Sequence, residues 1–500
     1  MLNAPWLFER AAVTPDRAAL HVDGATLRFG ALALRVRHLA AALRARGVRC
    51  GDVVAVLLEN ELRFVEILHA LDACGATLLP LNVRLSPREL CFQLGDSGAR
   101  LLLHGSEALA ETAAVTARMA PGVERVSADA LDDTTAPIHL EPLAPRAGTA
   151  APLAILYTSG TTGRPRGACL SRDNFLWSAV SASMHLGVHR DDHWLACLPL
   201  FHVGGLSILL RGVLCGTSTL LHRRFDADAV NRSIDTERVT HVSLTATMLQ
   251  RVLEARGGRD APAHLRCALI GGGPCSREIF ERARARRFPI ALTYGLTEAA
   301  SQVATRPACE EGGPDAGLTP LLGTELRIVD ARGAPVPTGV EGEIWVKSPS
   351  VMSGYIREPE GEGTSLRDGW LRTGDMGALD AEGRLRVFDR RSDLIISGGE
   401  NVYPAEVEAA LREHPAIADV GVTGVDDDEY GRRPAAWWVP RPGADAPSAR
   451  ELRAFCRERL AGYKVPLAFY RATSLPRNAA GKLQRHRLLE MQHDDHGANE

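Results

Sequence analysis

Short apolar runs alternate with amphipathic segments along much of this 500-residue chain, and the alternation limits the folds that it can adopt. The runs VVAVLL (53–58) and LAILYT (153–158) predict buried strands. Nearby, LALRVRHLAAALRARG (32–47) and FVEILHALDACGA (64–76) place Leu and Ala at helical spacing. Strands that alternate with helices in this way predict an α/β fold with largely parallel sheets.

A different pattern, near residues 325–390, predicts a small β-rich layer. Three short segments there alternate apolar and polar residues between Gly and Asp turns, namely ELRIVD, GEIWVKS and GRLRVFD. The stretch 104–150, in contrast, is rich in Ala, Pro and Thr and only weakly periodic. We therefore expect it to contain a surface loop before the next strand.

After Arg390 the sequence returns to short strands and helices, with amphipathic helices predicted in AEVEAALREHP (405–415) and ELRAFCRERLAGY (451–463). A chain of 500 residues is also too long for one compact core. We predict a large N-terminal domain over residues 1–391, with mostly parallel sheets, helices and the β-rich layer. A small α+β C-terminal domain is predicted over residues 392–500.

Composition argues against several classes of protein. The chain has 58 basic and 61 acidic residues, and its net charge of −3 argues against nucleic-acid binding as the main function. Ten scattered cysteines without a Cys-x-x-Cys pair fit reduced thiols and give no metal signature. The N-terminus reaches Glu9 and Arg10 before any long apolar run, and no run is long enough for a membrane span. We expect a soluble, cytoplasmic protein, and the sequence leaves open whether it forms a homo-oligomer.

A loop of small side chains, within LYTSGTTGRPRG (156–167), follows a predicted strand. Glycines let a backbone approach an anion closely, hydroxyls add donors, and Arg164 adds charge. The loop lacks the Gly-Lys-Ser/Thr of a Walker motif, which argues against a P-loop NTPase. Taken alone, the segment fits a surface loop better than a phosphate site, whose residues would be Thr158, Ser159, Gly160, Thr161, Thr162, Gly163 and Arg166.

Four further motifs follow in order: YGLTE (294–298), RTGD (372–375), DRRSDLIISGGENVYPAEVE (389–408) and PRNAAGKLQR (476–485). Together with the loop TSGTTGRPRG, they resemble the signature set of the adenylate-forming superfamily, which includes acyl-CoA synthetases, nonribosomal-peptide adenylation domains and luciferases. The resemblance covers essentially the whole chain. The superfamily usually has lysines where this loop has arginines, which keep the charge and bind phosphate with a fork of donors.

The resemblance implies a reaction in two steps that uses ATP, Mg²⁺ and coenzyme A. A carboxylate first attacks the α-phosphate of ATP, which gives an acyl-adenylate and pyrophosphate. A thiol then attacks the acyl carbon and releases AMP. Both steps develop negative charge, which fixed cations and hydrogen-bond donors must stabilise. The implied partners are a small-molecule carboxylic acid and CoA.

The resemblance also implies the nucleotide site. In YGLTE, Thr297 offers a hydroxyl to phosphate and Glu298 a carboxylate to Mg²⁺. Without the other motifs, Glu298 would serve equally well as a charge at a helix N-terminus. The remaining nucleotide contacts would be an adenine wall, an aromatic face and two ribose contacts, supplied by Gly271, Gly272, Gly273, Tyr294, Asp375 and Arg390.

By the same resemblance, Ser392 is the pivot of a hinge and the C-terminal domain is mobile between the two steps. Gly398 and Gly399 would line a narrow pantetheine channel. Lys482, one of three lysines in the chain, would be brought to the reacting carboxylate and α-phosphate for the first step. A compact ammonium suits that position better than a planar guanidinium. Lys464 also matches a superfamily lysine, but packing explains it equally well.

The acid itself is suggested by the segment after His202, which matches the superfamily histidine beside the acyl pocket. Alone, such a histidine is often a core residue. The predicted helix GGLSILLRGVL (204–214) carries Arg211 on an apolar face, where a cation is costly unless it meets an anion. A dicarboxylic acid would supply that anion, whereas the alternative is a side chain that reaches solvent past the helix. Ser301 and Thr245 are weaker candidates for the pocket wall.

Within the superfamily, the segments LPLFHVGGLSILLRGVLCGT, ALIGGGP and YGLTEAASQ are most similar to the bacterial 2-succinylbenzoate–CoA ligases of menaquinone biosynthesis. Their substrate has two carboxylates, so Arg211 would hold the carboxylate that does not react. Three alternatives stay open. They are a ligase for another aryl or medium-chain acid, an adenylation module that loads a carrier protein, and a non-catalytic nucleotide-binding protein, against which Lys482 and Glu298 argue.

Overall fold

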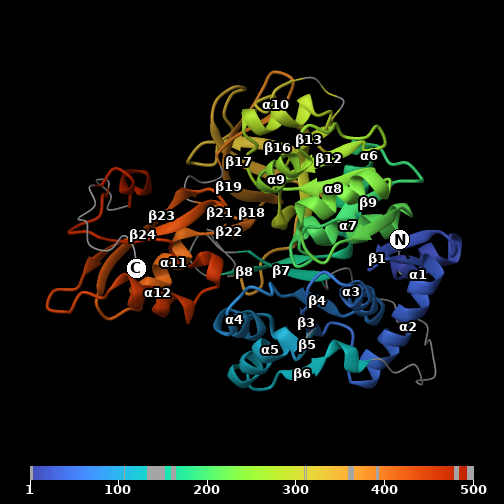
Figure 1. Cartoon of the computed structure of the whole chain (residues 1–500), viewed down its shortest axis with the longest axis horizontal. Coiled ribbons are helices and arrows are strands. Elements are labelled where there is room, and N and C mark those ends of the chain that lie inside the picture. The colour runs from blue at the N-terminus through green and yellow to red at the C-terminus, as the bar shows by residue number, and fades with distance from the viewer. Residues whose placement is uncertain are drawn as a thin grey trace. The chain divides into compact units, whose positions relative to one another are not determined.

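The computed structural model describes residues 4–105, 107–131, 152–158, 165–308, 310, 312–358, 365–389, 394–477 and 483–491. Contacts divide the chain into two compact units (Figure 1). The first unit comprises Met1–Val83, Leu94–Leu156 and Gly167–Phe388, and the second comprises Arg84–Gln93, Tyr157–Arg166 and Asp389–Glu500.

A nine-stranded sheet forms the centre of the first unit. Its strands are β1 (Ala18–Val22), β2 (Ala25–Arg28), β9 (His193–Ala196), β10 (Ser218–Leu221), β11 (His241–Leu244), β12 (Cys267–Ile270), β13 (Ile290–Leu296), β14 (Ser301–Arg306) and β15 (Thr319–Pro320). Their spatial order is β15-β14-β13-β12-β11-β9-β10-β1-β2. The strands from β13 to β1 in this order pair in parallel, whereas β2, β14 and β15 pair antiparallel at the two ends.

A six-stranded sheet has the order β6-β5-β3-β4-β7-β8. Its strands are β3 (Val53–Leu57), β4 (Thr77–Pro80), β5 (Leu101–His104), β6 (Glu124–Ser127), β7 (Ala154–Thr158) and β8 (Arg166–Leu170). The strands from β6 to β7 in this order pair in parallel. The predicted strands at 53–58 and 153–158 are confirmed as β3 and β7.

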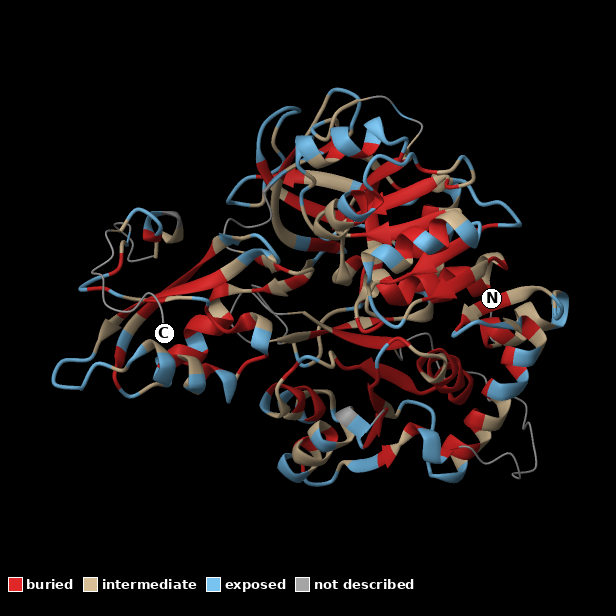
Figure 2. Ribbon diagram, viewed as in Figure 1, coloured by how far each residue is buried: buried red, intermediate tan, exposed pale blue. Residues whose placement is uncertain are grey.

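Helices cover both faces of the nine-stranded sheet. They include α2 (Phe29–Ala45), α3 (Leu62–Cys74), α6 (Arg172–Leu186), α7 (Val203–Cys215), α8 (Ala227–Thr236), α9 (Ala246–Arg256) and α10 (Arg277–Ala285). The other helices of this part of the chain are α1 (Trp6–Val13), α4 (Pro87–Ser97) and α5 (Glu107–Met119), of which α5 packs on β5 and β6 of the six-stranded sheet. Along β9, Trp194 belongs to a core shared with α2, α3, α6 and α7, whereas Leu195 belongs to a second core with α8, α9 and α10. Residues on both faces of the central strands are buried, as expected for a parallel sheet that is covered on both sides (Figure 2).

The predicted β-rich layer is a five-stranded sheet in which the described ladders are antiparallel. Its strands are β16 (Glu325–Val329), β17 (Gly342–Lys347), β18 (Leu366–Arg367), β19 (Trp370–Leu379) and β20 (Leu385–Asp389). The described residues also form short 3₁₀ helices, namely η1 (Ala128–Leu131), η2 (Thr297–Ala299), η3 (Gly462–Lys464) and η4 (Arg485–Leu488).

The second unit has its own sheet, with β21 (Ile395–Ser397), β22 (Glu400–Val402), β23 (Ile417–Asp427), β24 (Gly431–Pro440) and β25 (Phe469–Arg471), and two helices, α11 (Pro404–Arg412) and α12 (Ala449–Arg457). Ala436 and Trp438 of β24 face a core with these helices. Ala435 and Trp437 face a smaller core that includes Leu488. This period of two is that of a strand buried on both sides. The predicted α/β fold, with a β-rich layer and a smaller α+β part, is confirmed.

The stretch 104–150 contains more regular structure than the sequence suggested. Helix α5 and strand β6 lie within its first part, and residues 132–151 lie outside the described residues. The sequence of α5, EALAETAAVTARM, is rich in alanine, which favours a helix but adds little to hydrophobic periodicity. Across the described ranges, we find no helix that is long and apolar enough to cross a membrane.

Candidate active site

Four neighbouring parallel strands end at one edge of the nine-stranded sheet, and predicted site residues follow each of them. The register aligns β9 with β11, β11 with β12, and β12 with β13. Parallel strands have their carboxyl ends at the same edge, where open α/β sheets bind ligands. The edge therefore collects residues that lie far apart in the sequence, namely His202 after β9, Thr245 after β11, Gly271, Gly272 and Gly273 after β12, and Thr297 after β13.

Two of the predicted nucleotide residues touch each other. The Tyr294 hydroxyl donates a hydrogen bond of 2.7 Å to Oδ2 of Asp375. Tyr294 lies in β13 and Asp375 in β19, so the bond joins the nine-stranded sheet to the β-rich layer. The glycine segment lies beside the same strand, because a Cβ at Gly271 would come within 2.8 Å of Cγ2 of Thr293. These contacts place the predicted adenine and ribose residues at one location.

Glu298 lies in η2 and accepts a hydrogen bond of 2.5 Å from the hydroxyl of Tyr355. Tyr355 in turn forms an antiparallel bridge with Ala168 of β8, the strand that leaves the predicted phosphate loop. Sequence reasoning missed Tyr355, because its segment has no periodic pattern and no motif. A single carboxylate beside a hydroxyl fits a Mg²⁺ ion that takes its other oxygens from phosphate and water.

The turn after Glu298 has an unusual backbone. Ala300 has φ of 51° and Ser301 has φ of 112°, which is rare for residues with a side chain. The opposite strand accommodates this turn only through Gly295, where a Cβ would lie 2.0 Å from the Ser301 carbonyl oxygen. Backbone outliers of this kind concentrate at functional sites. Ser301 is therefore on a sharply constrained turn at the same edge as Thr297.

The segment before α7 is held in place by packing and by a buried amide. His202 is the N-cap residue of α7. A Cβ at Gly205 would lie 2.4 Å from the Pro199 carbonyl oxygen, so the helix start approaches this segment closely. Buried Asn60 donates to the Leu198 carbonyl and accepts from the Leu200 amide, both at 2.9 Å. Sequence reasoning missed Asn60, which no motif marks.

Arg211 lies in the interior of α7 and is only 4% exposed. The interpretation that its side chain reaches solvent is therefore wrong. Its Nε and Nη1 have no hydrogen-bond partner among the described residues. Burial lowers the pKa of Arg211 to about 10, so the guanidinium is still charged at neutral pH. Its closest described ring contact is with Trp194, whose centroid lies 4.6 Å from Cζ.

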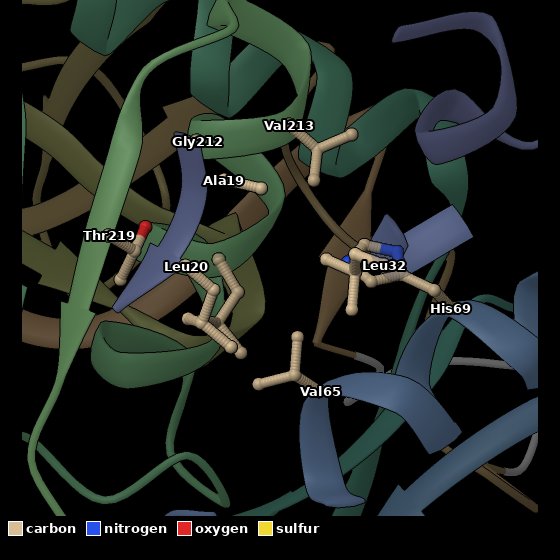
Figure 3. A pocket seen from close by; sticks show the side chains of 9 residues that line it. Ala19, Leu20, Leu32, Val65, His69, Gly212, Val213 and Thr219 are labelled. Carbon is tan, nitrogen blue, oxygen red and sulfur yellow. The ribbon is translucent and has the colours of Figure 1, made fainter. Parts of the chain in front are cut away.

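A small cavity of about 10 Å³ is lined in part by Leu209, Gly212 and Val213 of α7 (Figure 3). Leu20 of β1 and His69 of α3 also contribute to its lining. Burial lowers the pKa of His69 to about 4, so this imidazole is neutral. The volume is that of one water molecule, and Arg211 is not part of the lining. This cavity is therefore too small to hold the acid.

Thr245 caps α9, because its hydroxyl accepts a hydrogen bond of 3.2 Å from the Met248 amide. In the second unit, the Thr158 hydroxyl donates to the Arg166 carbonyl at 3.5 Å. The remainder of the predicted phosphate loop, Ser159, Gly160, Thr161, Thr162 and Gly163, lies outside the described residues, as do Arg390, Ser392 and Lys482.

The two flanks of the Lys482 segment are nevertheless well anchored. Arg477 and Leu483 form an antiparallel bridge on either side of it. Arg485 binds Glu408 of α11 through both carboxylate oxygens, with Nε–Oε1 at 3.0 Å and Nη2–Oε2 at 2.8 Å. Forked pairs of this type are strong and directional. The protein thus fixes the described residues on both sides of the segment that contains Lys482.

Gly398 and Gly399 form the turn between β21 and β22, with φ of 58° and 89°. Two-residue hairpins with two positive φ angles strongly favour glycine. A Cβ at Gly398 would also lie 2.8 Å from Cδ1 of Tyr430. The turn alone is thus enough to explain both glycines.

Lys464 has a structural environment. Its Nζ lies 2.7 Å from Oε1 of Glu406 and 2.7 Å from Oε1 of Glu89, all within the second unit. Burial alone would lower the pKa of Lys464, but the two carboxylates raise it overall. The ammonium is therefore charged and held between two fixed partners. These contacts favour the packing interpretation of this lysine.

The site geometry is that of an α/β enzyme that binds a nucleotide at the carboxyl edge of its sheet. The AMP-binding enzyme family matches residues 7–356, and the AMP-binding enzyme C-terminal domain matches residues 406–482. The chain belongs to the AMP-binding enzyme family.

Among its relatives is the 2-succinylbenzoate–CoA ligase of Bacillus licheniformis, which is 43% identical over 97% of this chain and 98% of its own. The solved structure of a double mutant of o-succinylbenzoate CoA synthetase from Bacillus subtilis, bound with a product analogue, is 39% identical. It covers 98% of this chain and 99% of its own, with a TM-score of 0.90. The Bacillus subtilis enzyme in complex with ATP and magnesium ion is also 39% identical, covers 97% and 99%, and gives a TM-score of 0.73.

Proposed function

We propose that this protein is an AMP-forming 2-succinylbenzoate–CoA ligase of menaquinone biosynthesis. It activates 2-succinylbenzoate with ATP as the acyl-adenylate and transfers the acyl group to CoA. The likeness to such ligases over nearly the full chain supports this activity. The observation that carries the choice of acid is buried Arg211, which has N–H donors without a hydrogen-bond partner in the described protein.

A buried guanidinium with unused donors is costly to the folded protein unless a ligand supplies an anion. 2-Succinylbenzoate has two carboxylates, and only one reacts. The other carboxylate can accept a forked pair of hydrogen bonds from Arg211, which suits guanidinium geometry. A fatty acid has no second anion and would leave the cation unpaired. The cation therefore favours a dicarboxylic acid over a monoacid.

The position of Arg211 on α7 supports this assignment. It lies nine residues after His202, which corresponds to about 13 Å of helix, and its side chain leans back toward the helix N-terminus. Ser207 and Gly204 precede Arg211 by four and seven residues and therefore lie on the same face of the helix. These residues are small, so the helix itself places little bulk between His202 and the guanidinium. Thr245 and Ser301 are proposed to complete the wall of the acid pocket.

The nucleotide is proposed to bind along the carboxyl edge. Gly271, Gly272 and Gly273 would face the adenine, and Tyr294 would stack on it. Asp375 would accept hydrogen bonds from the ribose, and the Tyr294 hydroxyl would hold its carboxylate in position. The phosphates would meet Thr297 and the loop from Thr158 to Arg166, whose glycines and hydroxyls suit an anion.

Glu298 is proposed to hold Mg²⁺, which when bound neutralises charge on the phosphate oxygens. The hydrogen bond from Tyr355 orients the carboxylate that would contact the ion. Second-sphere donors of this kind fix the direction in which a carboxylate presents its lone pairs.

We propose that Lys482 stabilises the charge that develops on the α-phosphate and the attacking carboxylate. The domain boundary is proposed between Arg391 and Ser392, with Ser392 as the pivot and a mobile C-terminal domain. Arg390 would contact the ribose, and Gly398 and Gly399 would line the pantetheine channel. We also propose a cytoplasmic location, because the cytoplasm supplies both ATP and CoA.

The function is tested by a panel of acids incubated with ATP, Mg²⁺ and CoA, with thioester formation as the readout. The panel contains 2-succinylbenzoate, its two monoacid analogues, an aryl acid, and medium- and long-chain fatty acids. We expect 2-succinylbenzoate to have the highest kcat/KM by at least about 100-fold. Equal turnover of a fatty acid would contradict the choice of acid. Transfer to a carrier phosphopantetheine without any CoA product would instead support an adenylation module.

The role of Lys482 is tested separately by Lys482→Ala. We expect adenylate formation, measured by pyrophosphate release, to fall at least about 100-fold, because an electrostatic contact in the transition state is lost. ATP binding, measured by calorimetry, should change little. Exposed Lys347, on β17, provides the matched control Lys347→Ala, which should leave both measurements unchanged. Normal pyrophosphate release in Lys482→Ala would contradict the assignment.

A further inference from the structure

Trp194 is the described side chain that stacks on the buried guanidinium of Arg211. The Cζ atom of Arg211 lies 4.6 Å from the centroid of the Trp194 ring. A guanidinium over an indole face is attracted by the ring quadrupole, and the attraction grows when both groups are desolvated. Trp194 is 8% exposed and Arg211 is 4% exposed, so water screens the pair very little. The indole thus partly offsets the cost of burying the cation.

The plane of the indole is itself fixed by two further contacts. Its Nε1–H donates a hydrogen bond of 3.1 Å to Oγ of Ser243 in β11. The ring of His241 stacks on it with a centroid distance of 4.7 Å and an interplanar angle of 23°. Burial lowers the pKa of His241 to about 4, so its imidazole is neutral and adds no charge near Arg211. Trp194 is therefore held by β11 and presents a rigid face.

No carboxylate competes for the guanidinium in the part of the chain that the structure describes. Asp192, two residues before Trp194, forms its ion pair with Arg266 and not with Arg211. The thiols near Arg211 are Cys215 and Cys267, and burial raises the pKa of Cys267 to about 12, which keeps it protonated at neutral pH. The indole face orients the cation while leaving Nε and Nη1 without a protein acceptor. Stacking occupies the flat face of a guanidinium but not the donors along its edge.

We propose that Trp194 is a positioning residue for substrate specificity, which holds the Arg211 guanidinium so that its edge can bind the non-reacting carboxylate of the acid. The proposal rests on the proposed function, because it requires that Arg211 binds that carboxylate. Trp194 does not contact the reacting atoms in this scheme. It should therefore affect the KM for the dicarboxylic acid and leave the chemical step unchanged.

The test compares Trp194→Leu with the conservative variant Trp194→Phe, which retains an aromatic face. We expect Trp194→Leu to raise the KM for 2-succinylbenzoate about tenfold, with kcat and the KM for ATP within about twofold of wild type. Trp194→Phe should recover most of the affinity. The monoacid analogue that lacks the non-reacting carboxylate should be used equally well by all three proteins. If Trp194→Leu does not fold, Ser243→Ala tests the same point by releasing the indole N–H, with an expected rise in KM of about threefold.

Arg211→Met, alone and combined with Trp194→Leu, separates this proposal from the proposed function. We expect Trp194→Leu to have no further effect on KM once Arg211 is replaced, because coupled residues are not additive. A normal KM in Arg211→Met would overturn the assignment of Arg211 and the positioning role with it. Two other results would overturn the positioning role alone. The first is a raised KM in Arg211→Met together with a normal KM in Trp194→Leu. The second is an equal loss of kcat/KM for the diacid and the monoacid analogue in Trp194→Leu.

Discussion

Two arginines in helices that pack against the nine-stranded sheet are almost fully buried but differ in their hydrogen-bond partners. Arg211 in α7 is 4% exposed, and Arg256 in α9 is 3% exposed. The guanidinium of Arg256 donates to Oδ1 of Asp235 at 2.7 Å, to Oδ1 of Asn231 at 3.1 Å and to the Asp260 carbonyl at 2.6 Å. Arg211 has two nitrogens without a protein acceptor. Both lie near an aromatic ring, so ring contact does not distinguish them.

The set of protein partners separates a structural cation from a cation that is free to bind a ligand. A buried charge that the protein itself pairs contributes to a fixed local structure, and its loss leaves partners unpaired. A buried charge that the protein leaves partly unpaired lowers stability, and such a cost persists where function requires it. Arg256 therefore fits the first class, and we propose that Arg211 belongs to the second. Substitutions at the two sites should have opposite consequences.

The largest effect is expected for Arg211→Met, which keeps much of the apolar volume and removes the charge. The KM for 2-succinylbenzoate should rise at least about 100-fold, because a buried charge pair with the substrate is lost. The free energy of unfolding should stay the same or increase, because an incompletely paired buried cation is removed. Steady-state kinetics and urea denaturation measure the two quantities. A large loss of stability with a normal KM would place Arg211 in the structural class.

Arg256→Met is the matched control at the second site. The free energy of unfolding should fall by about 2 kcal/mol, because Asn231 and Asp235 lose a buried partner. The KM for 2-succinylbenzoate should not change. Urea denaturation and kinetics on the same preparations provide the comparison. If Arg256→Met raised the KM as much as Arg211→Met, partner satisfaction would not distinguish the two roles.

Arg211→Lys tests the charge of this side chain through the pH dependence of KM. Burial lowers the pKa of Arg211 to about 10, which leaves the wild-type cation charged up to about pH 9. A lysine starts from a lower pKa, and the same burial would lower that pKa further. Because only the protonated amine binds a carboxylate, the KM of the variant should rise about tenfold from pH 7 to pH 9, while that of wild type stays nearly flat. A variant profile parallel to wild type would show that this side chain does not bind the acid.

The smallest effect is expected for Asp235→Asn. Its carboxylate contacts Arg256 and Arg259, each at 2.7 Å, but it is partly exposed to solvent. We expect a loss of about 1 kcal/mol in the free energy of unfolding, since an amide keeps one hydrogen bond but not the charge. The KM for the acid should be unchanged. A loss as large as that of Arg256→Met would mean that the ion pair alone, rather than the full set of partners, stabilises this site.

The sequence predicted the strands and helices with strong periodicity. The run at 53–58 became β3, and the predicted helix at 204–214 became α7 (Val203–Cys215). It did not predict α5, because the alanine-rich sequence of that helix carries little hydrophobic contrast. Strand order was also not predicted, because pairing between strands such as β1 and β10 depends on contacts across about 200 residues.

For the candidate site, the sequence suggested only those residues that stand in motifs. Glu298, Tyr294 and Asp375 stand in recognisable motifs, and the hydrogen bond between the last two agrees with a shared site. Tyr355 and Trp194 were not predicted, because neither stands in a motif and their contacts with Glu298 and Arg211 appear only in the folded chain. The sequence allowed two positions for the Arg211 side chain, buried against a ligand or extended to solvent, because an arginine within an apolar helix can adopt either.

The most direct test of the account compares two substrates in two proteins. Wild type and Arg211→Met are each assayed for kcat/KM with 2-succinylbenzoate and with the monoacid analogue that retains the reacting carboxylate. We predict that wild type prefers the diacid by about 100-fold and that Arg211→Met uses the two acids about equally. A variant that keeps the full preference for the diacid would contradict the account, because the second carboxylate would then be bound elsewhere.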